Sequence, residues 1–419
     1  MGHVGPKKVV RIDFPTQSGE TPWLVVQNLG LFTDASGTFT WLCDEAITPI
    51  GGLQDLVAVG STGDILLAGD STGLYRSTDA GCTFEPLGPP FDEHVMGRIS
   101  VSRDAPNEVL ATTQTLGRQN DIYRSTDSGE TWSALTLPIE GRIRQVLRSK
   151  SDAQRIYVMH SGGGLRSRNG GESFEPMPIA PADRMATGVE VDLLAVDESN
   201  SARVFAVITG FPTSTLIVSE DGGDSWTVRS DLTDIPDSLL PLSEETLLMS
   251  MPVNGVVRSE DGGRSWTPIE TPEGNGWMSC LTIDPTGKIW GCINRDDTFL
   301  AATSMDQGFT WTPVLDLTLA QAVRRRSCPV DTPAEQACVY VCEDYPAACP
   351  ADDRADQGIP ALDDGGIPQD GSMQNSGTSA VSTGCMLGRS PVNGKWPWML
   401  ISCFVLLSIR ARRRPPSPV

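Results

Sequence analysis

Apolar and polar residues alternate over short runs along most of the chain, as in RIYVMH (155–160) and RVFAVIT (203–209). Alternation with a period of two predicts half-buried β-strands, and turn signals such as STGD (61–64) and PTG (285–287) separate the runs. No long run with the 3.6-residue period of an amphipathic helix precedes residue 390. The pattern therefore predicts an all-β fold.

The predicted strands come in pairs that indicate hairpins. The clearest pairs are LVAV (56–59) with ILLAG (65–69), ISVSR (99–103) with EVLATT (108–113), and VDLLAVD (191–197) with RVFAVI (203–208). A third strand then ends in Arg-Ser or Val-Ser, as in DIYRS (121–125) and LIVS (216–219). A fourth begins soon afterwards at an aromatic residue, as in SWTPI (265–269). Four short strands therefore form one unit.

The turn between the third and fourth strands carries a repeated octapeptide, S-x-[D/N]-x-G-x-[T/S]-[W/F]. Its copies are STDAGCTF (77–84), STDSGETW (125–132), SRNGGESF (167–174), SEDGGDSW (219–226), SEDGGRSW (259–266) and SMDQGFTW (304–311). A seventh copy with shifted spacing is TDASGTFTW (33–41). The copies begin at 33, 77, 125, 167, 219, 259 and 304, a step of 40 to 52 residues. Such a period predicts an array of similar units.

Four positions of the octapeptide suit a tight turn. The Asp or Asn can accept backbone N–H bonds, the Gly can take φ > 0, the hydroxyls close local bonds, and the aromatic ring can fill space between sheets. The third position of each copy offers at most one carboxylate, too few for Ca²⁺, so the role predicted is structural. These residues are Ser77, Asp79, Gly81, Phe84, Ser125, Asp127, Gly129, Trp132, Ser167, Asn169, Gly171, Phe174, Ser219, Asp221, Gly223, Trp226, Ser259, Asp261, Gly263, Trp266, Ser304, Asp306, Gly308 and Trp311.

The octapeptide resembles the Asp-box, or BNR, repeat of sialidases, sortilin-type receptor domains, photosystem assembly factors and several glycoside hydrolases. The resemblance implies a β-propeller, with each box between the third and fourth strands of a blade and away from the ligand face. We expect seven four-stranded blades over 21–320, since a closed ring hides sheet edges. Closure is expected to combine strands from both ends of the domain in one blade. KVVRIDF (8–14), in the N-terminal segment 1–20, is a candidate closing strand.

The ten cysteines include no C-x-x-C pair of zinc-ribbon spacing, and His3, His94 and His160 are scattered, so neither a metal nor another cofactor is expected. Cys280 and Cys292 bracket one turn and predict a disulfide across a hairpin. Cys43 and Cys82 are a further candidate pair, because neighbouring blades would bring them close. Four cysteines predict a small disulfide-stapled segment over 321–350, namely Cys328, Cys338, Cys342 and Cys349. Together the cysteines predict an oxidising, exported setting.

The C-terminal part changes in character. Arg324–Arg326 is interpreted as a solvated linker, with a protease site as the alternative. The acidic, Gly- and Ser-rich composition of residues 351–384 predicts a disordered linker. Cys385, the apolar segment 396–409 and a terminal Arg cluster resemble the MYXO-CTERM sorting signal of myxobacterial surface proteins. The resemblance implies that 385–419 is a membrane anchor or sorting tail with a short hydrophobic helix, processed or lipidated at Cys385. An ordinary single-span anchor is the alternative, although the segment falls short of about 20 residues. Residues 1–20 show no export-signal core, so a longer gene product or another export route is expected.

A net charge of −21 argues against nucleic acid as a partner. Sialidase activity is not expected: the chain has no Arg-Ile-Pro motif, and Tyr75, Tyr123 and Tyr157 occupy predicted strands. The other tyrosines, Tyr340 and Tyr345, lie outside the propeller. No G-x-S-x-G elbow, P-loop or Rossmann glycine pattern is present.

Two groups of strand-end carboxylates could serve a glycoside hydrolase, although a role in a turn is the favoured interpretation of each residue. They are Asp192, Asp197 and Glu198 in one blade and Asp296 and Asp297 in another. A further candidate, His94 beside Asp92 and Glu93, lies on an expected exposed loop.

The sequence thus predicts an exported, cell-surface or outer-membrane-associated propeller that acts as a non-catalytic binding or scaffold module. Its expected partners are extracellular polysaccharide or a surface protein, met on the face opposite the boxes, and the membrane through the tail. A glycoside hydrolase with an unidentified carboxylate pair is the alternative. A sortilin-type receptor is a third hypothesis, which the smaller number of blades weakens.

Overall fold

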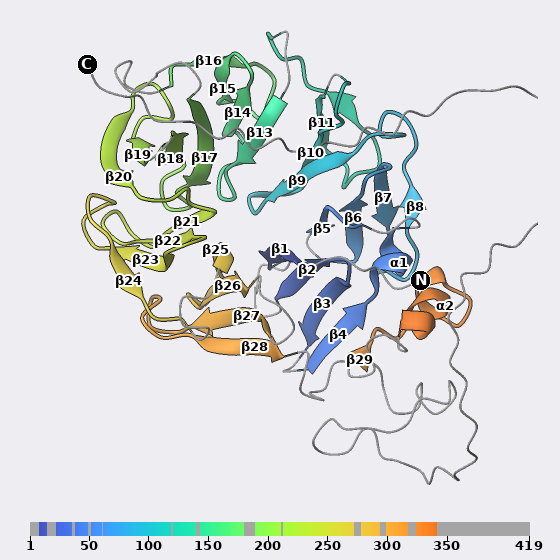
Figure 1. Cartoon of the computed structure of the whole chain (residues 1–419). Coiled ribbons are helices and arrows are strands. Elements are labelled where there is room, and N and C mark those ends of the chain that lie inside the picture. Colours follow the sequence, from blue (N-terminus) through green and yellow to red (C-terminus); the bar gives the residue numbers. More distant parts are fainter. Residues whose placement is uncertain are drawn as a thin grey trace, which may run out of the picture. The chain divides into compact units, whose positions relative to one another are not determined.

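The computed structural model of the protein describes residues 8–14, 22–35, 38–48, 52–60, 62–118, 120–139, 143–179, 189–210, 213–271, 278–293, 299–316 and 324–341. Their strands form seven sheets around one axis, a β-propeller (Figure 1). The prediction of an all-β fold with seven four-stranded blades is confirmed.

The strands of a blade lie in chain order from the axis outwards, and blades 1 to 7 follow one another along the chain. The first strands are β1 (Lys8–Asp13), β5 (Asp55–Val59), β9 (Met96–Ser102), β13 (Ile143–Arg148), β17 (Glu190–Val196), β21 (Ser238–Pro241) and β25 (Met278–Ile283). The second strands are β2 (Trp23–Gln27), β6 (Ile65–Gly69), β10 (Ala105–Thr113), β14 (Ile156–His160), β18 (Val204–Thr209), β22 (Leu247–Met251) and β26 (Ile289–Ile293).

The third strands are β3 (Gly30–Ala35), β7 (Leu74–Ser77), β11 (Ile122–Ser125), β15 (Gly163–Ser167), β19 (Ser214–Ser219), β23 (Gly255–Ser259) and β27 (Phe299–Ser304). The fourth strands are β4 (Thr38–Leu42), β8 (Glu85–Pro86), β12 (Ser133–Ala134), β16 (Glu175–Met177), β20 (Thr227–Leu232), β24 (Thr267–Ile269) and β28 (Thr312–Asp316). Each of the three predicted strand pairs forms the first two strands of a blade.

Strand direction defines two faces of the ring. Neighbouring strands in a blade are antiparallel, so the first and third strands run the same way. The third strands of blades 2 to 7 end at the repeated octapeptide, here called the box. The first strands therefore also end on the side that carries the boxes, the box face, and they begin on the opposite face.

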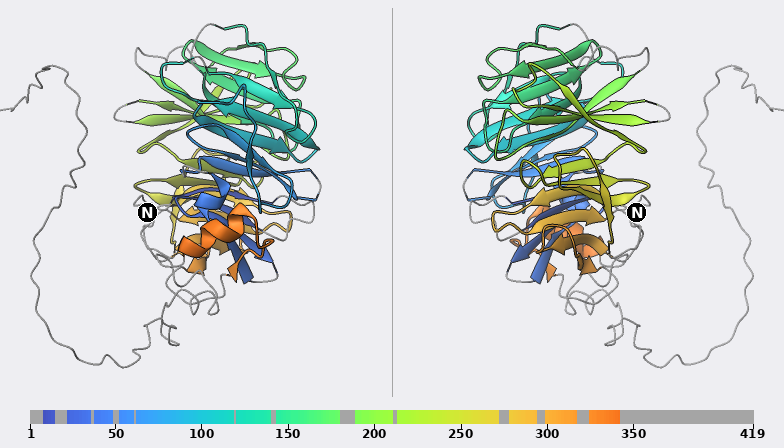
Figure 2. Two further views of the ribbon diagram at one scale, coloured as in Figure 1. Left: turned by 90° about the vertical axis from the view of Figure 1, so that its right-hand side faces the viewer. Right: turned by 90° about the vertical axis from the view of Figure 1, so that its left-hand side faces the viewer.

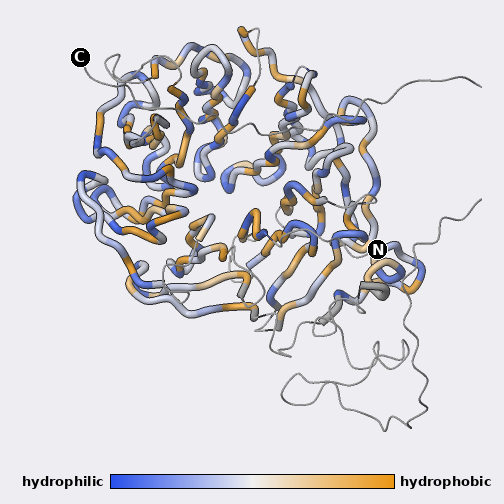
Figure 3. Tube along the Cα trace, viewed as in Figure 1, coloured by the Kyte–Doolittle hydropathy of each residue, from blue (hydrophilic) through white to orange (hydrophobic). Residues whose placement is uncertain are grey.

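Buried apolar side chains gather between neighbouring blades rather than within one blade. Val57 and Leu67 of blade 2 pack with Ile99 and Val109 of blade 3, and equivalent clusters fill the other interfaces. Apolar stretches lie within the blades and polar ones at many of the turns (Figure 3). The largest cluster joins blades 7, 1 and 2, where Phe14 meets Trp290 at a ring-centroid distance of 5.9 Å. Each blade thus depends on its neighbours for its core.

Blade 1 combines strands from both ends of the described chain, as expected, but the C-terminal strand is a fifth strand added at the outer edge. The candidate segment does form the first strand of blade 1, but β1 to β4 complete that blade without the C-terminus. A short strand from the far end, β29 (Arg324–Arg325), adds to the outer edge of β4 in parallel. Blade 1 therefore has five strands, and blades 7 and 1 meet without a shared strand.

The disulfides correct two predictions. Cys280–Cys292 joins β25 and β26, as expected. Cys43 does not pair with Cys82: the bonds are Cys43–Cys338 and Cys82–Cys328. Cys328 and Cys338 therefore attach their segment to the ring instead of forming a separate stapled unit. The solvated-linker interpretation of the Arg trio is also wrong, because this stretch contains β29 and continues into the ring contacts.

The described residues form two helices, α1 (Asp44–Ile47) and α2 (Pro333–Val341), which touch each other beside blade 1 (Figure 2). Neither helix is long and apolar enough to cross a membrane. The predicted linker 351–384, the tail 385–419 with Cys385, and Cys342 and Cys349 lie outside the described residues, as do Asp296 and Asp297.

Candidate functional site

The box serine and carboxylate hold their turn together. In blade 6, Ser259 Oγ accepts a bond from Gly263 N at 2.8 Å and donates one to Asp261 Oδ1 at 2.8 Å. Asp261 Oδ1 also accepts Ser265 N at 2.9 Å, and Asp261 Oδ2 accepts the Ser265 hydroxyl at 2.6 Å. The same serine-to-glycine bond is present in the other boxes of blades 2 to 7.

Blade 4 shows that the third box position needs no charge. Asn169 Oδ1 accepts Ser173 N at 3.0 Å, and Asn169 Nδ2 donates to Ser173 Oγ at 2.8 Å. The side chains of Ser167, Asn169 and Ser173 are thus bonded within the turn itself. Within the described ranges, no group of three or more His, Cys, Asp or Glu side chains is placed to hold a metal ion.

These bonds make the stability of the ring depend on pH. The hydroxyl and backbone N–H of Thr131 hold the pKa of Asp127 at about 2, and Thr310 does the same for Asp306, whose pKa is also about 2. An unfolded Asp has a pKa of about 3.9, so the bonds stabilise the fold fully above about pH 4 and lose their effect as pH falls towards 2. We expect the free energy of unfolding, measured with denaturant, to fall over that interval.

The matched variant is Asp127→Asn, because Asn169 shows that an amide fits this position. We expect it to be less stable than the wild type at pH 5 and to show a shallower decline between pH 4 and 2. An unchanged slope would mean that Asp127 does not contribute to the acid sensitivity.

A second set of side chains joins neighbouring blades through the boxes. The arginine before the box serine reaches the carbonyl of the fourth residue in the next box along the ring. Arg76 Nε donates to Ser128 O at 3.1 Å, and Arg166 Nη1 donates to Gly222 O at 3.0 Å. Arg258 Nη1 donates to Gln307 O at 2.5 Å. These arginines connect blades 2 and 3, 4 and 5, and 6 and 7.

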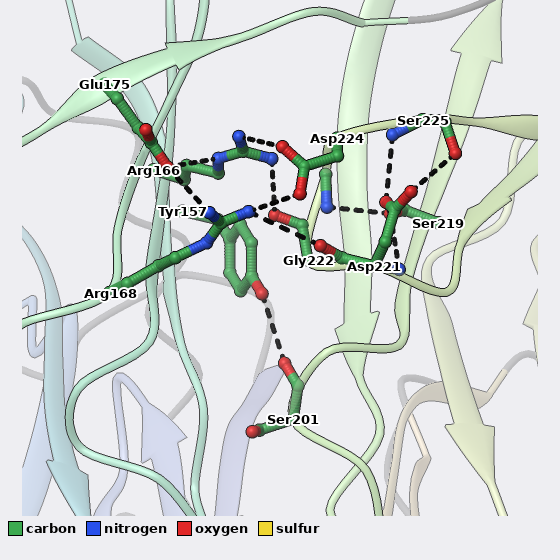
Figure 4. Close-up of polar contacts among 11 residues, drawn as sticks. Tyr157, Arg166, Arg168, Glu175, Ser201, Ser219, Asp221, Gly222, Asp224 and Ser225 are labelled. Atoms are coloured by element: carbon green, nitrogen blue, oxygen red, sulfur yellow. Dashed lines mark hydrogen bonds and ion pairs between the residues drawn. The ribbon is translucent and has the colours of Figure 1, made fainter.

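The connection between blades 4 and 5 carries the most charge (Figure 4). Arg166, whose side chain is 6% exposed, contacts Glu175 through Nε at 2.9 Å and also pairs with Asp224. Arg168 reaches the same two carboxylates, Asp224 at 2.6 Å and Glu175 at 3.3 Å, but its side chain is 39% exposed. The Arg-Ser ends of the third strands are visible in the sequence, but no local pattern predicts this contact with the next blade.

Side chains near the axis differ between the two faces. On the box face, residues that follow the first strands meet across the ring. Arg103 Nη1 lies 2.6 Å from Glu198 Oε2, and Lys150 Nζ lies 3.8 Å from Glu198 Oε1. Lys150 Nζ also donates to Thr282 Oγ1 at 3.3 Å, which connects blade 4 to blade 7. Polar bridges from four blades thus occupy the box-face end of the axis.

On the opposite face, Arg144 near the start of β13 pairs with Glu190 at 2.7 Å and Asp192 at 3.2 Å on β17. Burial raises the pKa of Asp192, although Arg144 opposes this shift. On the neighbouring β9, Arg98 is exposed, and its guanidinium contacts no hydrogen-bonding or charged partner among the described residues. Near their starts on this face, three neighbouring first strands therefore carry one cation without a partner among the described residues, one paired cation and two carboxylates, here called the axial cluster.

The structure places the other carboxylate candidates in supporting roles. Asp197 is buried and accepts Ser199 N at 2.8 Å and the Ser199 hydroxyl at 2.7 Å within its own turn. Glu198 lies between two cations on the box face, whereas Asp192 lies towards the opposite face. The structure therefore does not bring these three carboxylates together as one pair or triad.

The tyrosines and histidines are also used by the fold. The Tyr75 hydroxyl lies 2.8 Å from Thr72 Oγ1, the Tyr157 hydroxyl donates to Ser201 O at 3.1 Å, and the Tyr123 ring packs against Phe91. Burial raises the pKa of all three tyrosines. His94 Nδ1 lies 3.2 Å from Thr115 Oγ1, and Glu93 pairs instead with Arg118 at 3.0 Å. His160 Nδ1 accepts Gly162 N at 3.1 Å.

Comparison with known proteins supports the fold. No family model and no curated protein matches the sequence. An ancestral GH74 enzyme superposes with a TM-score of 0.56 at 11% identity, covering 74% of this chain and 46% of that one. The GH74 xyloglucanase from Xanthomonas campestris gives a TM-score of 0.52 at 18% identity, covering 73% of this chain and 54% of that one.

A third similar structure is the extracellular domain of BT4673 from B. thetaiotaomicron, with a TM-score of 0.53 at 15% identity. It covers 71% of this chain and 38% of the other. The chain therefore spans about half or less of the length of these three structures. At such identities the similarity establishes the propeller fold.

Proposed function

We propose that this protein is an exported propeller that binds extracellular polysaccharide or a surface protein without chemical turnover, and that its C-terminal tail displays it on the cell surface. The observation that carries the binding proposal is the asymmetry of the axis. On the box face a polar bridge joins blade 4 to blade 7, whereas on the opposite face Arg98 is exposed near the start of β9 and Arg144 pairs with the neighbouring β17. Three disulfides support export, because such bonds persist in oxidising compartments.

The contacts of the candidate carboxylates favour binding over hydrolysis. A glycoside hydrolase uses two carboxyl groups that face one substrate bond. Asp197 is bound within its turn, and Glu198 is held between Arg103 and Lys150. A ligand at the axial cluster would instead meet side chains that donate and accept hydrogen bonds, which suits hydroxyl-rich sugars and polar peptides.

A glycoside hydrolase remains the second candidate because of one observation. Burial raises the pKa of Asp192, which is the direction of shift expected for a general acid, and Glu190 shares its arginine. Two of the similar structures are GH74 enzymes, and one is a xyloglucanase. Here Asp192 and Glu190 would be the residues to test.

The two candidates are separated by incubating the protein with bacterial and plant polysaccharides, including xyloglucan, and measuring both retained ligand and new reducing ends. We expect retention without new reducing ends, and at least about a tenfold weaker affinity for Arg98→Ala, since a charge-assisted bond contributes roughly 1.5–3 kcal/mol. Arg264→Ala is the control, because Arg264 is exposed and belongs to a box on the other face.

The possible outcomes assign the function. New reducing ends that disappear in Asp192→Asn would replace the binding proposal with hydrolysis. Retention that is equal in Arg98→Ala and Arg264→Ala would place the ligand away from the axial cluster. If no polysaccharide is retained, we would infer a protein partner, whose binding can be tested with the same two variants.

A further inference from the structure

We propose that residues 324–341 form a disulfide-locked clasp that closes the propeller between blades 7 and 1. The clasp consists of β29, the stretch 326–332 and α2. It lies on the outer side of the ring, where α2 meets α1 beside blade 1 (Figure 2). The clasp is the last segment that the structure describes, and its contacts join it to blades 1 and 2, the first blades of the chain.

The junction between blades 7 and 1 depends on packing. β1 contacts β25 and β26, and the two blades share a cluster that includes Phe14 and Trp290, yet none of the described strands belongs to both blades. In a ring of separate blades this junction is where the two ends of the domain meet. It can open without breaking a covalent bond of the backbone, so other contacts must hold it closed.

The first contact of the clasp is made by its backbone. Arg324 and Arg325 pair in parallel with Thr40 and Trp41 at the outer edge of blade 1, and Arg326 N donates to Trp41 O at 2.8 Å. The first described residues after β28 of blade 7 therefore pair with blade 1. This backbone pairing bridges the junction from outside.

Two disulfides then fix the clasp to two different blades. Cys338 in α2 bonds to Cys43, directly after β4 of blade 1, and Cys328 bonds to Cys82 in the box of blade 2. Ala334 N also donates to Cys82 O at 3.3 Å. The bonds span 295 and 246 residues of chain, so together they close almost the whole ring covalently. Long loops of this kind restrict the unfolded chain the most.

Arg326 of the clasp lies against blade 2, although its Nη1 has no hydrogen-bond partner among the described residues. Blades 2, 4 and 6 each supply an arginine to the next box, but blade 1 has Phe32 at the corresponding position. A Cβ placed on Gly81 would lie 3.4 Å from Arg326 Nη1, so this guanidinium lies against the box of blade 2. Burial lowers the pKa of Arg326, while Asp64 and Asp79 partly offset the shift. The clasp thus brings an arginine to a box that blade 1 leaves without one.

The clasp has a consequence for a protein displayed through its C-terminal chain, a step that rests on the proposed function. A force applied to the chain after residue 341 would be transmitted through the Cys338–Cys43 disulfide to blade 1. Without the disulfides the same pull would separate β29 from β4 and then remove β28, the outer strand of blade 7. The two bonds therefore direct load away from the strands that are easiest to remove.

The first test compares hydrogen exchange in the intact wild type and in a variant with serine at Cys43, Cys82, Cys328 and Cys338. We expect exchange in β1 and β2 to rise by about tenfold or more and exchange in β14 and β15 of blade 4 to change less than about twofold, since opening is local to the junction. The comparison variant is Cys280→Ser with Cys292→Ser, which removes a disulfide within one hairpin of blade 7. Because β25 and β26 contact β1, we expect some increase in β1 exchange, but a smaller one than in the four-serine variant.

Equal increases in all seven blades, or unchanged exchange in blade 1, would overturn the proposal. If the four-serine variant does not fold, the same exchange measurement is made on two variants, one without Cys43–Cys338 and one without Cys82–Cys328. The second test pulls on the two ends of single oxidised molecules. We expect residues 43–338 of the wild type not to extend, whereas full extension would show that the bonds carry no load. Failure of either test would leave the result of the polysaccharide assay intact.

Discussion

Gly308→Ala should lower the free energy of unfolding by about 3 kcal/mol. Gly308 in the box of blade 7 has φ +92°, a conformation that costs an alanine about 1–2 kcal/mol. A new Cβ would also lie 2.7 Å from Leu248 Cδ1 in blade 6, and Leu248 is fully buried. Overpacking of this kind costs about 1–3 kcal/mol, because the closely packed side chain has no free space to move into.

The matched control is Gly287→Ala in the same blade. Gly287 has φ +90°, but a Cβ there would meet no atom within 4 Å. Its cost should therefore be limited to the backbone conformation, about 1 kcal/mol. Denaturant unfolding of both variants measures the difference. Equal losses would show that the box glycine is required for its backbone conformation alone and that the close packing between blades contributes little.

Arg166→Ala should destabilise the propeller by about 2–3 kcal/mol. The buried Arg166 guanidinium donates to Gly222 O and pairs with Glu175 and Asp224 (Figure 4). Its loss leaves a buried carbonyl without a donor and removes a side chain that packs between blades 4 and 5. Glu175 and Asp224 are half exposed and stay hydrated, which keeps the loss below that of a fully buried pair.

Arg168→Ala is the control, since Arg168 pairs with the same two carboxylates from a more exposed position. It should cost less than about 1 kcal/mol, as is usual for exposed ion pairs. High salt should reduce the effect of Arg168→Ala more than that of Arg166→Ala, because only exposed charges are strongly screened. Equal losses for both variants at low salt would mean that charge, rather than burial and the bond to Gly222, holds the two blades together.

Particular residues show how far local sequence patterns could predict the fold. Alternating runs such as 203–208 predicted strands because side chains in a strand alternate between two faces. The repeated Ser, Asp and Gly predicted the box turn because all of its bonds lie within a few residues. The pairing of Cys280 with Cys292 was equally local, since both cysteines lie in one hairpin.

Pairings between distant residues could not be predicted in the same way. Cys43 was matched with Cys82 because both lie near boxes of neighbouring blades, whereas its partner is Cys338, 295 residues away. The carboxylates at 192, 197 and 198 are close in sequence, yet Asp197 binds its own turn while Glu198 and Asp192 lie towards opposite faces. No pattern in the sequence pointed to Arg98 and Arg144, because they lie on two different first strands, which become neighbours only in the folded ring.

The sequence alone determined the number of units, the strands within each unit and the chemistry of each box, because these depend on interactions between residues near one another in the chain. The tertiary structure decided how the ring closes, which cysteines pair and which polar side chains meet at the axis. Those outcomes depend on the relative positions of blades, which a repeat pattern shared by every unit does not specify. The physical reason is the closed ring itself, since it brings the last described segment against the first two blades.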